Sequence, residues 1–339
     1  MKRAFLTGGS GFVGANLARL LIAEGWAVRA LVRPASDRRN LDGLALEIVE
    51  GDLTDPDLAD KIGACDAVFH VAALYTLFRS QWAALMRSNV DGTRNVLAAA
   101  RTAGVARTVY TSSVAAIGVR SGALADETYQ SPPERLIGTY KLSKYLAERE
   151  AVAAAAGGQD VVIVNPTTPL GAWDRKPTPT GEILVRFLTG NMPAIVKTGL
   201  NFVDVRDVAR GHLLAYEHGR SGERYILGSE NLALGTLLER VGRVAGRRAP
   251  SFTVPGWLPL GVAWVEETIL ARAGRAPKLS VDSVRMSRES MYYDASKAKA
   301  QLGFAPAPID AAIGEAVKWF EQNGYLGSHG GAARNAAPR

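Results

Sequence analysis

The chain has 339 residues, of which 47% are hydrophobic and 22% charged, so it can bury a sizeable core as one large domain or two moderate ones. Its formal charge of +7 permits anionic partners, but the basic residues are scattered and not interleaved with aromatic ones, which argues against nucleic acid as a partner. The single cysteine, Cys65, excludes a disulfide framework, fits a cytoplasmic location and is expected to be a buried structural thiol.

The sequence predicts neither a membrane-spanning segment nor a signal peptide. No run of about 18 uncharged apolar residues occurs, and residues 1–3 lead directly into the first predicted strand. The apolar stretch at residues 257–265 is short and contains Pro259. Packing in the core explains this stretch more simply than peripheral contact with a membrane, which stays open as an alternative.

Six apolar segments are predicted as strands, at residues 3–6, 27–32, 47–50, 67–71, 107–111 and 161–165, with helical segments between them. This alternation predicts an α/β fold with a doubly wound, Rossmann-type parallel sheet covered by helices on both faces. Nearly continuous apolar character is typical of strands buried on both faces. Ligands are expected at the carboxyl ends of such strands.

The pattern changes after residue 165, where prolines become frequent. We expect a dinucleotide-binding core at residues 1–165 and a smaller, discontinuous C-terminal region at 166–326 that is mostly substrate-binding, with some segments returning to the core. No flexible linker separates the two, so the second region is not expected to be independent. The tail at residues 327–339 is predicted to be disordered.

The segment TGGSGFVG at residues 7–14 follows the first predicted strand and precedes a helix predicted at 16–23. Gly8 allows a tight turn, Gly11 lets a pyrophosphate approach the first helical N–H groups, and Gly14 lets the helix lie close to the sheet. Phe12 and Val13 lie in the same turn. These five residues are predicted to bind a dinucleotide; the alternative is a plain strand-to-helix turn.

Tyr140 and Lys144 lie four residues apart in a predicted helix, one turn from each other on the same face. An ammonium group at that spacing can lower the pKa of a phenol, which can then exchange a proton with a carbonyl or hydroxyl group. The alternative is an exposed pair. Ser113 ends a run of hydroxyl residues after the strand at 107–111 and can bind a substrate oxygen or cap a helix.

Together these three motifs resemble the extended branch of the short-chain dehydrogenase/reductase superfamily, the NAD-dependent epimerase/dehydratase family, over residues 2–325. Further segments fit that branch, at residues 51–55, 70–73, 89–93, 165–167 and 202–209. Segments at 37–41, 47–52, 176–181 and 225–228 resemble more narrowly the hopanoid-associated sugar epimerases, which are relatives of dihydroflavonol 4-reductases.

The resemblance implies that Tyr140 is the acid/base, that Lys144 lowers its pKa and holds the nicotinamide ribose, and that Ser113 orients the substrate oxygen. It makes Asn165 a candidate substrate contact. It also implies further cofactor contacts beside the adenine, along the dinucleotide and at the nicotinamide, at Asp52, Leu53, Val71, Ala72, Ala73 and Pro166.

The loop between Ser113 and Tyr140 contains an acidic pair, Asp126 and Glu127. We expect this pair to be solvated rather than to contact the substrate.

The choice of cofactor depends on Arg33, which lies 19 residues after Gly14, where an acidic residue would bind the ribose 2′-hydroxyl of NAD. An arginine suits the 2′-phosphate of NADP, and Arg38 and Arg39 lie in a loop that could close on it. The alternative is NAD bound without the acidic residue. Epimerases that resemble this chain keep NAD tightly bound, whereas NADP suits net reduction.

We therefore expect an enzyme that moves hydride between NADP(H) and a secondary alcohol or ketone, with a sugar or a hopanoid-pathway compound as candidate small-molecule substrates. The alternatives are a nucleotide-sugar epimerase with tightly bound NAD and a non-catalytic, dinucleotide-sensing regulator. The resemblance implies a homodimer that forms through a helix pair. The histidines are scattered without metal-ligand spacing, so no metal is expected, and His70 is predicted to be a core residue with satisfied hydrogen bonds.

Overall fold

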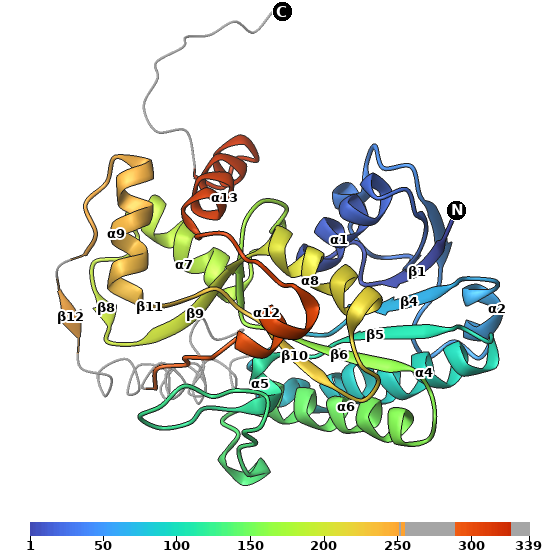
Figure 1. Ribbon diagram of the computed structural model, residues 1–339. Coiled ribbons are helices and arrows are strands. Elements are labelled where there is room, and N and C mark those ends of the chain that lie inside the picture. Colours follow the sequence, from blue (N-terminus) through green and yellow to red (C-terminus); the bar gives the residue numbers. More distant parts are fainter. Residues whose placement is uncertain (251, 255–288, 327–339) are drawn as a thin grey trace, which may run out of the picture.

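A seven-stranded parallel sheet forms the centre of the computed structural model, which describes residues 1–250, 252–254 and 289–326 (Figure 1). The strand order is β10–β6–β5–β4–β1–β2–β3. The strands are β1 (Arg3–Thr7), β2 (Ala27–Val32), β3 (Glu47–Glu50), β4 (Ala67–His70), β5 (Arg107–Thr111), β6 (Val161–Pro166) and β10 (Arg224–Leu227). The six strands predicted for the first half are all present, with ends that differ by at most one residue, and the predicted doubly wound α/β fold is confirmed.

Helices cover both faces of this sheet (Figure 1). One face carries α1 (Phe12–Ala23), α8 (Val205–His218) and α12 (Ser296–Leu302), and the other carries α2 (Leu58–Ile62), α4 (Gly92–Thr102) and α6 (Thr139–Ala156). Successive strand residues point to opposite faces: Leu6 packs in the cluster with α1 and α8, whereas Phe5 packs with α2 and α4. Each such side chain contributes about 1.5–3 kcal/mol by leaving water.

Strand β3 does not fit the expectation that every strand is buried on both faces. Glu47, Ile48 and Glu50 are exposed, because β3 lies at the edge of the sheet and, among the described strands, pairs with β2 alone. The other sheet strands of the first half are almost wholly buried.

A second, smaller core lies beyond the carboxyl end of β6. A three-stranded sheet, β11–β9–β7, packs against α7, α9 and α13, and a two-stranded sheet pairs β12 with β8. Their bounds are β7 (Thr168–Leu170), β8 (Ile195–Val196), β9 (Gly199–Asp204), β11 (Glu230–Ala233), β12 (Thr253–Val254), α7 (Pro179–Leu188), α9 (Leu234–Ala245) and α13 (Asp310–Gln322). The chain after β6 thus supplies elements to both cores, while the assignment of residues 166–326 to substrate binding stays a prediction.

Short helices surround the carboxyl edge of the main sheet. They are α3 (Trp82–Leu85), a π-helix (Met86–Asp91) that continues into α4, α5 (Val114–Ile117), and 3-10 turns at Arg39–Leu41, Arg79–Gln81 and Pro133–Arg135. Cys65 is buried, as expected. Within the described residues no helix has the length and apolar character needed to cross a bilayer. The stretch at 257–265 and the tail at 327–339 lie outside the described residues.

Candidate active site

The glycine turn between β1 and α1 leaves no space for side chains. A Cβ atom on Gly14 would lie 2.1 Å from the carbonyl oxygen of Gly8, and one on Gly8 would lie 2.6 Å from the main-chain nitrogen of Ala72. Helix α1 begins at Phe12, earlier than the predicted residue 16, and Gly11 at its N-cap provides no side-chain cap. The first N–H groups of the helix therefore point to a narrow site that no side chain caps. Such a site binds the diphosphate of a dinucleotide, so the residues present here fit a dinucleotide cofactor.

A chain of hydrogen bonds through His70 ties β1 to β4 beside this turn. The Thr93 hydroxyl donates to a main-chain carbonyl oxygen of its own helix at 2.6 Å, so its oxygen accepts the Nε2 proton of His70 at 3.0 Å. Nδ1 then accepts from the Thr7 hydroxyl at 2.7 Å, and the Thr7 oxygen accepts the N–H groups of Val71 and Ala72 at 3.2 and 3.1 Å. His70 is therefore a satisfied core histidine, as predicted, and it fixes the loop that faces Gly8.

His70 makes the stability of the protein depend on pH. Burial, with a smaller contribution from the charge of Lys144, lowers its pKa to about 3. The unfolded chain binds a proton here below about pH 6.5, so the stabilisation is complete above that pH and is lost as the pH falls towards 3. We expect His70→Gln to flatten the pH dependence of the unfolding free energy between pH 6 and 4 by up to about 1.4 kcal/mol per pH unit.

Urea unfolding of both proteins at pH 7 and pH 5 measures this difference, and the same change at the exposed His218 is the control. Equal pH slopes for the wild type and His70→Gln would show that the histidine is not held neutral.

The predicted adenine end of the site lies at the carboxyl ends of β2 and β3. Arg38 pairs with Glu50, and Arg39 pairs with Asp37 at 2.6 Å. Arg33, directly after β2, is exposed and forms no ion pair with any described residue. The predicted contacts Asp52 and Leu53 follow β3; the Asp52 carboxylate accepts two hydrogen bonds from Thr54, and Leu53 is buried.

Ser113 and Tyr140 come together at the carboxyl end of β5. Ser113 is the N-cap of α5, where its hydroxyl oxygen accepts from the N–H of Ala115 at 3.1 Å, so the capping alternative is observed, while binding of a substrate oxygen stays a prediction. A hydrogen bond from Ser113 favours ionisation of Tyr140, but burial outweighs it and raises the pKa of the phenol to about 12. The phenol therefore carries its proton at neutral pH.

The amine of Lys144 is bound at the end of β5. The buried Nζ donates to the carbonyl oxygen of Thr111 at 2.8 Å and to the hydroxyl of Tyr110 at 3.3 Å. Its ammonium is therefore bound at the end of β5, and burial lowers its pKa to about 8. Burial sets the direction of the pKa shift at the Tyr140 phenol, and the expected lowering of that pKa by Lys144 stays a prediction.

Two further residues lie at the site: Tyr75, in a segment expected to line the substrate pocket, and Asn89, which was not predicted as a site residue. The ring of Tyr75 lies 4.4 Å from that of Tyr140, centroid to centroid, and Tyr75 remains 43% exposed. Asn89, in the π-helix, binds both main-chain groups of Leu74 and donates to the Ser143 hydroxyl at 3.0 Å. It therefore joins the loop after β4 to helix α6. In the sequence, Asn89 belongs to a segment that resembles the family, at residues 89–93. No pattern in that segment predicts a π-helix.

Asn165 and Glu127 lie in surroundings that differ from those expected. Asn165 is fully buried, and its amide donates to the carbonyl oxygen of Ser113 at 3.0 Å and to Glu148 Oε2 at 2.7 Å, so its donors bind the protein itself rather than a substrate. Glu127 was expected to be solvated but is buried, and its carboxylate accepts from the N–H of Ile226 at 2.7 Å. Pro166 ends β6 beside Asn165, on the same edge as Val71 to Ala73.

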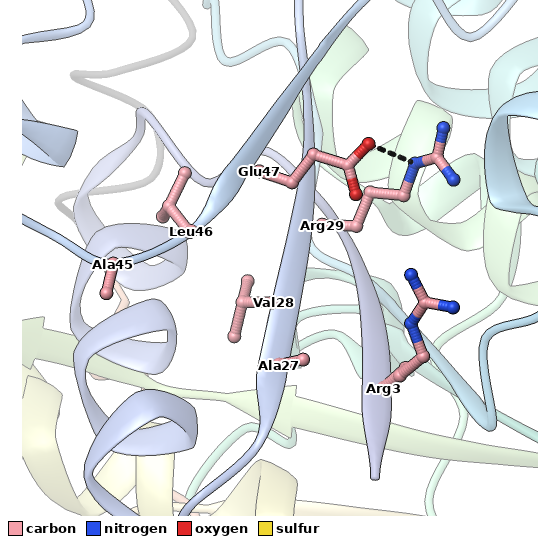
Figure 2. Close-up of a pocket in the computed structure, with 7 residues that line it drawn as sticks. All are labelled: Arg3, Ala27, Val28, Arg29, Ala45, Leu46 and Glu47. Carbon is pink, nitrogen blue, oxygen red and sulfur yellow. Dashed lines mark ion pairs between the residues drawn. The ribbon is translucent and has the colours of Figure 1, made fainter. Parts of the chain in front are cut away.

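A pocket lies at the amino ends of the strands, on the side of the sheet away from the candidate active site (Figure 2). It is lined by first residues of strands, Arg3, Ala27 and Glu47, together with Val28, Arg29, Ala45 and Leu46. Arg29 and Glu47 form an ion pair of 3.5 Å there. Because ligands of open α/β sheets bind at the carboxyl ends, this pocket is not the candidate active site.

Comparison with known proteins identifies the family of this chain. The family model described as NAD dependent epimerase/dehydratase family matches residues 4–228. A putative dihydroflavonol 4-reductase from Synechocystis is 57% identical, with 95% of each chain covered, and sterol demethylase protein B from Methylococcus capsulatus is 34% identical over 95% of this chain and 99% of its own. The crystal structure of gox2253 is 44% identical, with a TM-score of 0.86 over 96% of this chain and 100% of the other. This chain belongs to the NAD-dependent epimerase/dehydratase family and is an NAD(P)-dependent enzyme of the short-chain dehydrogenase/reductase superfamily.

Proposed function

We propose that the protein moves hydride between NADP(H) and a ketone or secondary alcohol, with reduction as its working direction. The observation that carries this proposal is the adjacent pair of hydroxyl groups on Ser113 and Tyr140, at the same sheet edge as the uncapped glycine turn. A phenol whose pKa is raised to about 12 stays protonated at neutral pH and is a proton donor, which is what a ketone oxygen needs as hydride arrives at its carbon.

In this proposal Ser113 holds the substrate oxygen and Tyr140 donates the proton to it. The bound nicotinamide supplies the hydride. Lys144, already bound to Thr111 and Tyr110, uses its remaining N–H donor on the nicotinamide ribose. The glycine turn and the N-terminus of α1 hold the diphosphate, and the loop after β4, fixed by His70 and Asn89, lies along the dinucleotide.

An assay of the purified protein with NADPH and a panel of carbonyl compounds tests this reaction. We expect one NADPH to be oxidised for each alcohol formed. Conversion of UDP-glucose to its epimer without net consumption of cofactor would favour the alternative, a nucleotide-sugar epimerase with bound NAD. Binding of dinucleotide with no turnover of any panel compound would favour the sensing regulator.

We propose NADP rather than NAD because Arg33 is exposed and unpaired among the described residues beside the expected ribose position. We expect Arg33→Ala to raise the KM for NADPH about 10- to 100-fold, the loss of one charge-assisted contact, and to leave the KM for NADH within about twofold. Steady-state kinetics with both cofactors measure this. The exposed Arg101 at the end of α4 gives the matched control, Arg101→Ala. An equal change with both cofactors would contradict the assignment to NADP.

The relatives' names support a substrate that contains several rings. A dihydroflavonol and a sterol are both polycyclic, and hopanoid-pathway compounds share that character. The half-exposed ring of Tyr75 beside Tyr140 offers an aromatic surface for such a ring system. The panel therefore includes a dihydroflavonol and a sterol ketone. We further propose a cytoplasmic location and a homodimer; light scattering of the purified protein tests the homodimer.

A further inference from the structure

A buried ion pair lies one helical turn beyond Lys144. Tyr140, Lys144 and Glu148 are spaced four residues apart on α6 and therefore lie along one face of the helix. Glu148 is only 3% exposed, and its Oε1 lies 2.9 Å from Nη1 of Arg224 on β10. Burying two charges costs several kcal/mol per ion, so a pair at this depth is weak evidence for a role in stability alone.

The other carboxylate oxygen of Glu148 leads to Ser113. Glu148 Oε2 accepts from Nδ2 of Asn165 at 2.7 Å, and the same Nδ2 donates to the carbonyl oxygen of Ser113 at 3.0 Å. The Asn165 side chain is thus oriented by a carboxylate from the catalytic helix. Through Asn165, Glu148 therefore restrains the main chain of Ser113, whose hydroxyl is proposed to bind the substrate.

Glu148 also acts on Lys144 through space. The groups placed against the Lys144 amine are Tyr110 from β5, neutral His70 from β4 and Glu148 from its own helix, with Tyr140 one turn away on that helix. Burial disfavours the ammonium, and the charge of Glu148 opposes that effect. Tyr140 keeps its proton at neutral pH, so Glu148 supplies the negative charge among these groups.

We propose that Glu148 is a positioning residue of the active site: it holds Ser113 in place through Asn165, and its charge stabilises the ammonium of Lys144. Arg224 compensates the buried carboxylate from the other side, with its remaining donors bound to the loop at residues 127–130. The catalytic consequences rest on the proposed reductase function.

The replacement Glu148→Gln removes the charge and keeps the shape. The glutamine side chain has one acceptor oxygen and one NH2 donor, whereas the carboxylate accepts with both oxygens. The NH2 group must therefore face a donor of either Arg224 or Asn165, and that hydrogen bond is lost. The matched control is Glu150→Gln on the same helix, where Glu150 pairs with Arg94 at 2.8 Å in a more exposed position. Asn165→Ala removes both hydrogen bonds of the Asn165 amide, to Glu148 and to Ser113, and leaves both charges of the ion pair in place.

The first measurement needs no substrate. The protein is labelled with [13C]lysine, its Lys144 signal is assigned with Lys144→Arg, and the signal is followed by NMR from pH 6 to 11. We expect the pKa of Lys144 to fall by at least about 1 in Glu148→Gln and to stay unchanged in Glu150→Gln and Asn165→Ala. An unchanged titration in a folded Glu148→Gln protein overturns the electrostatic role.

The second measurement is NADPH-dependent reduction. We expect kcat to fall about 10- to 100-fold in Glu148→Gln and Asn165→Ala, because the substrate-binding hydroxyl is displaced in both. Asn165→Ala leaves the charge beside Lys144 in place, so in that variant the KM for NADPH stays within about twofold of the wild type. Activity in both variants equal to that of Glu150→Gln overturns the positioning role. If Glu148→Gln does not fold, Asn165→Ala still tests that role. If the wild type reduces no panel compound, the reductase proposal fails, whereas the NMR titration still tests Glu148.

Discussion

Replacing Tyr140 by phenylalanine is expected to lower kcat for ketone reduction about 10²- to 10⁴-fold while NADPH binding stays within about twofold of the wild type. The phenol is the proton donor at the site, and phenylalanine keeps the ring that packs at 4.4 Å against Tyr75. The fold therefore has no reason to change, and the loss is confined to the chemical step. Steady-state kinetics and NADPH fluorescence titration measure the two quantities separately.

The matched control is Tyr145→Phe, because Tyr145 is a partly buried tyrosine on the same helix. It should retain wild-type kcat. If Tyr140→Phe keeps more than about a tenth of the wild-type kcat, a group other than this phenol provides the proton.

Replacing Gly14 by alanine is expected to weaken NADPH binding at least about 100-fold. The added methyl group would lie 2.1 Å from the carbonyl oxygen of Gly8, closer than atoms can approach, so the turn must open and the first N–H groups of α1 lose their alignment. Isothermal titration with NADPH measures the affinity, and circular dichroism shows whether the fold is kept.

Gly314, inside α13, provides the control because a Cβ atom there meets nothing within 4 Å. Gly314→Ala should stabilise the protein by about 0.5–1 kcal/mol and leave NADPH affinity unchanged. Binding by Gly14→Ala within about threefold of the wild type would mean that the dinucleotide does not lie on this turn.

The fold could be predicted from the sequence because each element carries a local signal. The apolar runs of β1, β2, β4, β5 and β6 reflect burial on both faces, which the clusters around Phe5 and Leu6 illustrate. The edge position of β3 could not be predicted, since strand order is a property of the whole sheet. Helix α1 begins at Phe12, earlier than predicted, because residues 12–14 of the glycine segment already form its first turn.

At the site, spacing predicted which residues lie close together but not where their polar atoms bind. The four-residue interval places Tyr140 and Lys144 on one face, yet the Lys144 amine binds Thr111 and Tyr110, which come from a strand about 30 residues earlier. Glu148 continues the same interval and could have been found by extending the pattern one turn further.

The resemblance to the family made Asn165 a candidate substrate contact. In the structure Asn165 is buried, because β6 lies between β5 and β10 in the sheet. No local pattern around Asn165 reports that position in the sheet.

The central claim, hydride transfer at the Ser113–Tyr140 edge, is tested most directly with deuterium-labelled cofactor. The purified protein is incubated with a reducible ketone and NADPH carrying deuterium on one or the other face of nicotinamide C4, and the alcohol is analysed by mass spectrometry. Our account predicts one deuterium on the new carbinol carbon for each NADPH oxidised, from only one of the two labelled forms. Unlabelled alcohol from both labelled forms, or an inverted substrate with the cofactor unconsumed, would contradict it.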